Sequence, residues 1–210
     1  MKALPLVLVL GLAAAGCSSL DRSRDLANPN VPAATTAQQV CSNCHGIDGN
    51  SVNPTFPKLA QMPEPYLVEQ LKAFRAHHRQ DPPGYEYMWG ITRSLTDAQI
   101  DGLAKYFSSQ SSKPNPRPNP VGVQQGRQIF EKGVPEKGIP ACGTCHGAQG
   151  QGMATFPRLA GQHADYVEKQ LMVFQRTEER MPEGAAMKDV AHSLTPEHIR
   201  DVAHYVATLP

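Results

Sequence analysis

Two short stretches of the chain carry the same pattern of two cysteines followed by a histidine. CSNCH occupies residues 41–45, and CGTCH occupies residues 142–146. The cysteines are Cys41, Cys44, Cys142 and Cys145, and the histidines are His45 and His146. On the first turn of a helix, two cysteines at this spacing can form thioethers to one haem, and the next imidazole can bind its iron. The pattern therefore predicts two covalently attached haem c groups.

Other chemistries use C-x-x-C as well, including thioredoxin-like redox pairs, zinc sites and disulfides. A thioredoxin-like pair would require a mixed α/β pattern around the motif, which the sequence lacks. A zinc site would require four ligands close together, whereas each half of the chain offers two cysteines. The histidine after the second cysteine favours haem in both copies.

The rest of the chain is also duplicated. FPKLA at 56–60 matches FPRLA at 156–160, and YLVEQLKAF at 66–74 matches YVEKQLMVF at 166–174. SLTDAQIDGLAKYFSS at 94–109 matches SLTPEHIRDVAHYVAT at 193–208. We therefore expect two tandem domains, at 36–110 and 123–210, joined by a proline-rich, extended linker at 111–122.

The final segment of each repeat has the periodicity of an amphipathic helix. Apolar residues recur at helical spacing: Ile100, Leu103, Ala104 and Phe107 in the first repeat, and Ile199, Val202, Ala203 and Val206 in the second. Thr96 with Gln99 is typical of a capping box, and Thr195 before Pro196 is typical of a helix start. No long stretch alternates with period two, so the expected fold class is all-α. Tyr106 and Tyr205 recur in these helices, where we expect them to pack.

The face of the iron opposite the histidine requires a second ligand in an electron carrier. Of the seven methionines, only Met88 and Met187 recur, each six residues before the final SLT motif. We therefore predict that they bind the two irons, although a core-packing role is the ordinary alternative for methionine. Met181 is the alternative in the second domain, and His77 or His78 in the first. The remaining unrepeated histidines are expected at the surface: His163, His192, His198 and His204.

The first sixteen residues resemble a secretory signal peptide, with one lysine, a short apolar run and small residues. The segment ends in LAAAGC, which favours lipidation of Cys17; ordinary cleavage near residues 13–15 is the alternative. Residues 17–35 would then be a polar tether, and the mature protein would lie in the periplasm, anchored to the membrane by lipid.

Composition limits the remaining possibilities. The 210 residues include 20 basic and 19 acidic side chains, for a formal net charge of +1, and no basic run suggests nucleic-acid binding. Aromatic residues make up 6%, so domains of this size would have thin cores without a prosthetic group. Two haems would supply the missing apolar surface.

Taken together, these motifs resemble the dihaem cytochrome c4 family over about residues 36–210. The resemblance implies two class I cytochrome c domains packed face to face, with a pseudo-twofold relation and haem propionates near their interface. It also implies that Pro57 and Pro157 accept a hydrogen bond from the haem histidines, which would fix the orientation of each ring. A loop-ending role is the alternative for both prolines.

The resemblance further implies single-electron transfer in a periplasmic respiratory chain, with no enzymatic activity. The donor would be a quinol-oxidising complex or a dehydrogenase, and the acceptor a terminal oxidase. A cytochrome subunit of a dehydrogenase complex and a dihaem peroxidase are the alternatives. The two repeats differ where Gln61 replaces the glycine found at position 161, so we expect a different local loop there. The segments before Met88 and Met187 also differ, which predicts two distinguishable haem potentials.

Overall fold

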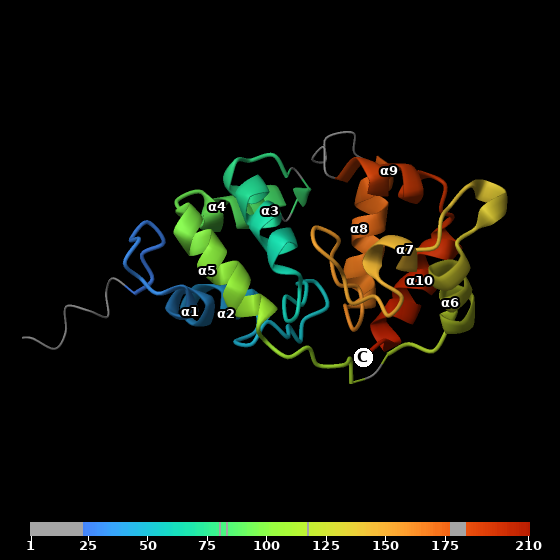
Figure 1. The fold of residues 1–210 in the computed structure, drawn as a ribbon, viewed down its shortest axis with the longest axis horizontal. Helices are drawn as coiled ribbons and strands as arrows, with labels where there is room; N and C mark the ends of the chain where they lie inside the picture. The colour runs from blue at the N-terminus through green and yellow to red at the C-terminus, as the bar shows by residue number, and fades with distance from the viewer. Residues whose placement is uncertain (1–22, 80, 83, 117, 177–183) are drawn as a thin grey trace, which may run out of the picture.

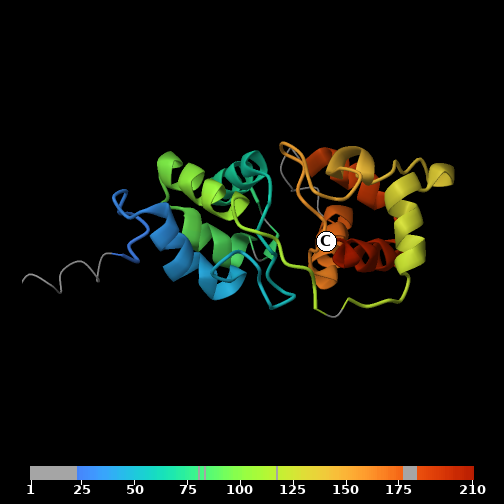
Figure 2. The same cartoon turned by 60° about the horizontal axis from the view of Figure 1, so that its bottom comes forward.

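A computed structural model of the chain describes residues 23–79, 81–82, 84–116, 118–176 and 184–210, with the side chain of Tyr85 left aside. The two halves of the chain form two helical domains that lie side by side, joined by the linker that crosses between them (Figures 1 and 2). The described residues contain no β-strand, only the isolated bridges Val134–Ile139 and Met153–Phe156. The expected all-α fold is therefore confirmed.

The helices follow one another in the same general order in both domains. The first domain contains α1 (Ala33–Thr36), η1 (Ala37–Cys41), α2 (Ser42–His45), α3 (Glu64–Arg75), η2 (Gly84–Met88), α4 (Trp89–Thr92) and α5 (Asp97–Ser108). The second contains α6 (Val123–Lys132), η3 (Pro135–Lys137), α7 (Gly143–His146), α8 (Ala164–Arg176), α9 (Ala185–His192) and α10 (Pro196–Thr208).

The final helix of each domain begins as the sequence predicts. The Thr96 hydroxyl accepts a hydrogen bond from the Gln99 amide, and the Thr195 hydroxyl accepts one from the His198 amide. These caps satisfy amide groups that would otherwise lack partners at the helix start. The apolar faces predicted for both helices are buried in the two hydrophobic cores.

The first and last helices of each domain cross at a glycine, which lets their backbones approach closely. On α6, a Cβ added to Gly126 would lie 1.9 Å from the carbonyl oxygen of Asp201 on α10. In the first domain the glycine is on the last helix: a Cβ on Gly102 of α5 would lie 2.7 Å from that of Ala33 on α1. Beside the second crossing, Tyr205 packs on Phe130 at 5.4 Å between ring centroids, the packing role expected for this tyrosine.

The first domain begins earlier than the boundary expected from the sequence. Val31 is buried, Leu26 packs against the first core, and the carbonyl of Asn28 accepts a hydrogen bond from Gln99. The part of the expected tether from residue 26 onward therefore packs against the domain. Residues 1–22, which include Cys17, lie outside the described residues. In the described part of the chain, no helix has both the length and the apolar character needed to cross a bilayer.

The linker is held by both domains. Asn50 of the first domain pairs with the backbone of Ser111 and Lys113, and the Asn115 side chain donates to carbonyls of the second domain at 2.9–3.1 Å. The described linker residues 111–116 and 118–122 contain no helix. These contacts at both ends tie the linker to the two domains.

Two contacts at the domain interface are related by the sequence repeat. The side-chain amide of Gln162 pairs with both the N–H and the carbonyl of Lys58, at 2.9 and 3.0 Å. In the equivalent position, the N–H of Arg158 lies 3.2 Å from the sulfur of Met62. Because residues 58 and 158, and residues 62 and 162, are equivalent in the repeat, the interface is pseudo-symmetric at this point.

A buried arginine makes a third interdomain contact, which the repeat does not duplicate among the described residues. Arg79 forms an ion pair with Asp81 at 2.7 Å and lies 4.5 Å from the centre of the Phe74 ring. The same guanidinium donates to Gln70 on α3 and to Gln170 on α8, which are equivalent residues of the two domains. Arg79 thus connects α3 to α8.

Candidate functional site

The two C-x-x-C-H motifs lie on helical turns, but the helices differ. In the second domain, Cys142 is the N-cap of the single-turn helix α7, in agreement with the expected position on a first turn. In the first domain, α1, η1 and α2 form one continuous helical run, and the motif occupies its end. Cys41 is likewise the N-cap of α2, so the position of the motif on its helix agrees in both domains. In the first domain the entering helix leads directly into the motif, whereas residues 133–141 separate α6 from the motif of the second domain.

Each motif histidine has one ring nitrogen fixed by a proline carbonyl. The distance from His45 Nδ1 to Pro57 O is 2.9 Å, and the distance from His146 Nδ1 to Pro157 O is also 2.9 Å. A carbonyl can only accept, so Nδ1 carries the proton and donates it. In the neutral ring, Nε2 then has a free lone pair, as an iron ligand requires. Burial lowers the pKa of both histidines, against the opposing effect of the proline carbonyls.

The glycine after each histidine is required by the backbone. Gly46 and Gly147 have φ of 79° and 84°, in the region that glycine adopts without steric cost. A Cβ at Gly46 would lie 3.0 Å from the carbonyl oxygen of Asn50. This glycine ends the helix and turns the chain toward the loop that leads to Pro57.

The four motif cysteines are free thiols that suit covalent attachment of haem. All four are without a disulfide partner, and burial raises the pKa of Cys41 and of Cys142 to about 11. Among the described residues, no three His, Cys, Asp or Glu side chains come together as a metal cluster. Two thiols and one imidazole per motif are the donors that a haem c uses, so the residues fit this group.

The two repeated methionines occupy similar places in their domains. Met88 is the last residue of η2 and precedes α4, and its carbonyl accepts a hydrogen bond from Thr92. Met187 lies on α9 and packs against the second hydrophobic core. Both side chains are half-buried and lie on short helical segments before the final helix. Met181, the alternative ligand in the second domain, lies outside the described residues.

The alternative histidine ligands of the first domain lie at the end of α3. His78 is exposed, as expected, but His77 is half-buried and stacks on Trp89 with 4.7 Å between ring centroids. The N–H groups of His77 and His78 bond to Phe74 and Ala73, and His77 has φ of 60°. Such bonds close the C-terminus of a helix. These contacts show His77 in a helix-capping position.

Three of the histidines expected at the surface have structural contacts instead. One is His198, which is half-buried and whose Nδ1 accepts a hydrogen bond from the Thr195 N–H at 3.4 Å. His204 is buried on α10, where its Nδ1 lies 2.8 Å from the carbonyl of Val121 and holds the end of the linker. His163 Nε2 lies 2.9 Å from the carbonyl of Ser51 in the other domain. Neither His163 nor His204 has a repeat partner in the sequence, so the repeat did not indicate these contacts. His192 is exposed, as expected.

The loop around Gln61 does not differ as expected. Gln61 and Gly161 both have a left-handed backbone, with φ of 55° and 69°. The N–H of Gln61 bonds to the carbonyl of Phe107, and that of Gly161 bonds to the carbonyl of Val206. The same contact with the last helix therefore holds both loops, and Gln61 accepts an unfavourable backbone conformation to make it.

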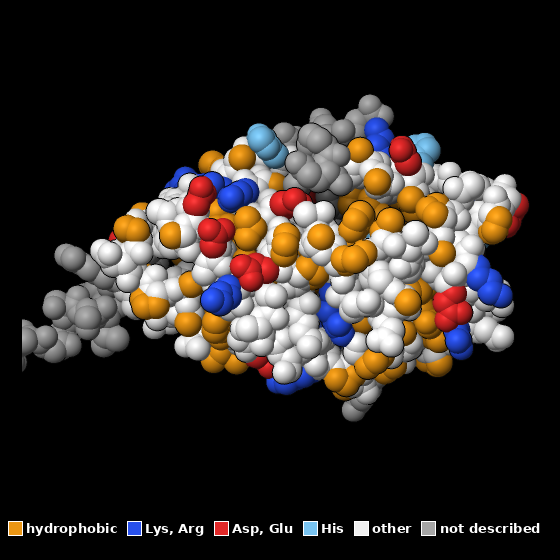
Figure 3. Space-filling model, viewed as in Figure 1, with side chains coloured by type: hydrophobic (Ala, Val, Ile, Leu, Met, Phe, Trp, Pro, Cys, Tyr) orange, Lys and Arg blue, Asp and Glu red, His pale blue; other side chains and the backbone are white. Residues whose placement is uncertain are grey.

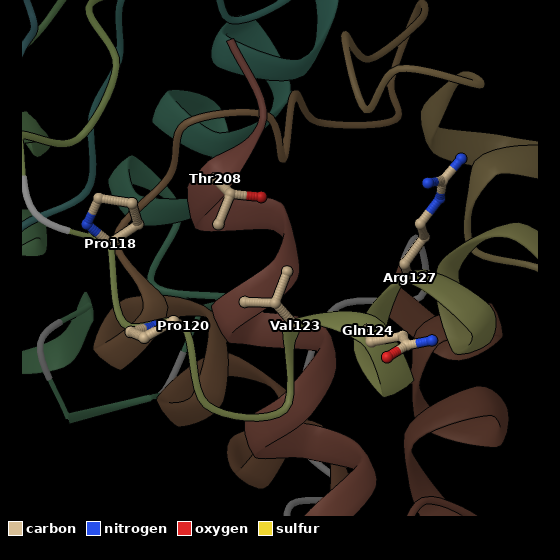
Figure 4. Close-up of a pocket in the computed structure, with 6 residues that line it drawn as sticks. All are labelled: Pro118, Pro120, Val123, Gln124, Arg127 and Thr208. Carbon is tan, nitrogen blue, oxygen red and sulfur yellow. The ribbon is translucent and has the colours of Figure 1, made fainter.

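Cavities and surface patches add no second site to the described residues. A cavity of about 590 Å³ lies away from both motifs, between the linker, α6 and α10 (Figure 4). It is lined by Pro118, Pro120, Val123, Gln124, Arg127 and Thr208. On the face shown in Figure 3, acidic and basic side chains are interspersed, in keeping with the balanced overall charge.

Sequence reasoning missed the residues that join the two domains. Lys58, Met62, Arg158 and Gln162 form the pseudo-symmetric contact. Arg79 and His163 form two further contacts between the domains. Lys58 and Arg158 directly follow the prolines that bond to the haem histidines. Their place in the repeated FPKLA and FPRLA motifs is the sequence feature that could have indicated these two interface residues.

Comparison with known proteins places these sites in a family. The cytochrome c family matches residues 32–111 and again 123–210. Cytochrome c-552 of Acidithiobacillus ferridurans is 36% identical over 97% of this chain and 84% of its own length. Cytochrome c4 of Stutzerimonas stutzeri is 38% identical over 81% of this chain and 84% of its own length. A thiosulfate dehydrogenase electron acceptor of Thiomonas intermedia is 35% identical over 81% and 78%.

Solved structures agree with the sequence relatives. The cytochrome c4 structure of Acidithiobacillus ferrooxidans is 39% identical, with a TM-score of 0.73, and covers 80% of this chain and 98% of that one. The thiosulfate dehydrogenase TsdBA of Marichromatium purpuratum has a TM-score of 0.73 and 34% identity, over 90% of this chain and 40% of that one. Two tandem cytochrome c domains carry two haem c groups, and the chain belongs to the cytochrome c family, within the dihaem cytochrome c4 group.

Proposed function

We propose that each domain holds its haem with the residues that the motifs predict. Thioethers join the haems to the four cysteines, His45 and Met88 bind the first iron, and His146 and Met187 bind the second. The equal His–Pro hydrogen bonds of 2.9 Å in the two domains support this assignment. The prolines Pro57 and Pro157 would orient the imidazole rings and make them more basic ligands.

The haem supplies the one-electron change of oxidation state, and the chain supplies a fixed and largely dry environment for it. Histidine and methionine on opposite faces would leave no position open for substrate, which favours transfer over chemistry. The methionine ligand and burial would raise the reduction potential. Because both histidines are already fixed by backbone carbonyls, little rearrangement would accompany a change of oxidation state.

We infer that this protein carries single electrons in a periplasmic respiratory chain, toward a terminal oxidase, and is not itself an enzyme. The observation that carries the proposal is the repetition in both domains of a C-x-x-C-H motif whose histidine lies 2.9 Å from a proline carbonyl. A quinol-oxidising complex is the donor that fits this role. Signal cleavage before Cys17, with lipid attached there, would anchor the protein to the membrane on the periplasmic side.

A second function is favoured by one relative and one structure. The Thiomonas relative is named a thiosulfate dehydrogenase electron acceptor, and the Marichromatium structure, which this chain matches over 40% of its length, is a thiosulfate dehydrogenase. The donor of this protein would then be a dehydrogenase that oxidises an inorganic sulfur compound. Both functions require the same ligand sets, so they differ in the partner and not in the haem sites.

The optical spectrum of the oxidised protein tests the ligand sets. Methionine bound to ferric haem gives a weak charge-transfer band at the red end, and we expect an intensity that corresponds to two haems. Met88→Ala and Met187→Ala should each remove half of that band, whereas Met153→Ala, at an exposed position, should leave it unchanged. A wild-type spectrum with high-spin features and no such band would contradict the carrier proposal and direct attention to peroxidase chemistry.

The donor is tested separately with the intact protein. Reduction should be fast when the protein is mixed with membranes that contain a quinol-oxidising complex and slow with thiosulfate and its dehydrogenase. The reverse order of rates would favour the dehydrogenase partner.

A further inference from the structure

A lysine is buried at the domain interface without a carboxylate beside it. Lys58 is only 6% exposed, and its ammonium group donates to the carbonyl of Lys113 at 2.7 Å. Burial lowers the pKa of Lys58, and the positive charge of Arg158 lowers it further. A buried charge is costly unless an opposite charge or several hydrogen bonds compensate for it.

The repeat-equivalent residue in the second domain has a similar environment. Arg158 is half-buried, and its Nε–H is buried without an acceptor among the described residues. Its Nη2 donates to the backbone oxygen of Pro210. Burial lowers the pKa of Arg158. A guanidinium group with a buried and unused donor is a site for an anion, because it binds carboxylates through two parallel hydrogen bonds.

These two cations lie close enough for each to act on the other, and the described residues provide little negative charge beside them. His163 lies across the same interface, and burial lowers its pKa first, with Lys58 contributing. Asp165, the acidic group near His163, raises that pKa. No described acidic side chain forms an ion pair with Lys58 or Arg158. Lys58 therefore has only the neutral carbonyl of Lys113 as a partner, whereas Arg158 bonds to the terminal oxygen of Pro210 and keeps its Nε–H unused.

The position of the two residues connects them to the haem sites. Each directly follows the proline whose carbonyl holds a haem histidine. Each haem brings two carboxylates, its propionates, and these are the anions that the family's own cofactor provides. We propose that Lys58 and Arg158 are a pseudo-symmetric binding site for haem propionates at the domain interface, where they set the potentials of the two haems.

The expected electrical effect follows from the sign of the charges. A cation near a haem stabilises the reduced form, which has one positive charge fewer at the iron, and it also offsets the negative charge of a propionate. Loss of the cation should therefore lower the reduction potential. We expect a change of about tenfold in the electron-transfer equilibrium constant, which equals about 59 mV for one electron.

The experiment measures the two haem potentials of the intact, haem-loaded protein from pH 5 to pH 8. The variants are Lys58→Met, Arg158→Met and the conservative Lys58→Arg. The matched control is Arg127→Met, which removes an exposed cation on α6 that is 64% exposed and paired with Glu131. Haem content is measured first, because it tests the proposed function separately from this inference.

Both neutral variants should lower at least one potential by about 59 mV at pH 8, with Lys58→Arg and Arg127→Met close to wild type. The difference in potential between the neutral variants and wild type should diminish at pH 5. Loss of the cation raises the pKa of the propionate, so in the variants the propionate takes up a proton and loses its charge as the pH falls. If Lys58→Met does not take up haem, Arg158→Met alone decides the question.

Three results would overturn the inference. The first is a shift of the haem potentials in Lys58→Met and Arg158→Met that is no larger than the shift in Arg127→Met. The second is a shift in these two variants that has the same size at pH 5 and at pH 8. Replacement of chloride by phosphate at constant ionic strength could also move the wild-type potentials, which would show that the cations bind an exchangeable anion instead. A chain without haem would contradict the proposed function, whereas a loaded chain with unshifted potentials would contradict only the propionate site.

Discussion

The buried ion pair between Arg79 and Asp81 offers a strong test of the interdomain contact. The two side chains are 5% and 1% exposed, and the guanidinium also bonds to Gln70 and Gln170. Arg79→Met keeps much of the apolar volume beside Phe74 but removes the charge and all of these hydrogen bonds. The carboxylate of Asp81 would then remain in a buried position without the guanidinium.

The expected cost is large for a single substitution. Removal of one partner of a buried ion pair costs about 3–5 kcal/mol, because the remaining charge is no longer compensated. For a chain of this length, each kcal/mol corresponds to roughly 2–4 °C in Tm. We therefore expect Arg79→Met to lower the Tm of the haem-loaded protein by about 6–20 °C. Arg79→Met combined with Asp81→Leu should recover most of this loss, since the site then holds neither the guanidinium nor the carboxylate.

Thermal unfolding followed by circular dichroism measures the effect. Arg127→Met is the matched control, because its ion pair with Glu131 is exposed to solvent and contributes little to stability. A loss of less than about 1 kcal/mol in Arg79→Met would refute the reasoning. Equal losses in the single and double variants would show that packing, and not the charge of Asp81, determines the cost.

Three further predictions concern single positions. Gln61→Gly should stabilise the protein by up to about 1 kcal/mol, because Gln61 has φ of 55° and is exposed; an unchanged or lower Tm would contradict this. Gly126→Ala should cost at least about 2 kcal/mol, since its Cβ would meet the backbone of α10, whereas Gly90→Ala, which meets nothing within 4 Å, should not destabilise. His163 should make stability dependent on pH. Burial and Lys58 lower the pKa of His163 in the folded protein below its value in the unfolded chain. The unfolded chain therefore binds the proton more tightly, and the stability present above about pH 6.5 is lost as the pH falls. The fall in Tm between pH 7.5 and pH 5 should be smaller in His163→Gln than in wild type; equal falls would refute the assignment.

Local sequence signals predicted the fold of each domain well. The caps at Thr96 and Thr195 and the apolar spacing in α5 and α10 depend on residues close together in the chain, and the structure contains both. The start of the first domain was less predictable. Leu26 and Val31 pack against the core, but two isolated apolar residues in a polar segment give no periodic signal.

Part of the candidate site was also predictable. The prolines lie 2.9 Å from the histidines, as the resemblance implied, because the loop between them is fixed by its glycine turn. The ligand roles of Met88 and Met187 stay predictions. The difference expected at Gln61 was wrong because a hydrogen bond to the last helix outweighs the preference of the residue for other backbone conformations.

The interface could not be predicted because its symmetry is hidden by different residue types. Met62 is not among the methionines that recur, because Gln162 occupies its repeat position. In the structure both side chains accept a hydrogen bond from the backbone N–H of the opposite domain, at Arg158 and Lys58. A thioether is a weak acceptor and has no donor, whereas an amide has both, so only Gln162 also bonds to the Lys58 carbonyl. The two contacts are therefore equivalent in position, but the contact made by Gln162 has one hydrogen bond more than the contact made by Met62. The replacement of methionine by glutamine between the repeats, which argues against Met62 as an iron ligand, thus occurs at an interface position.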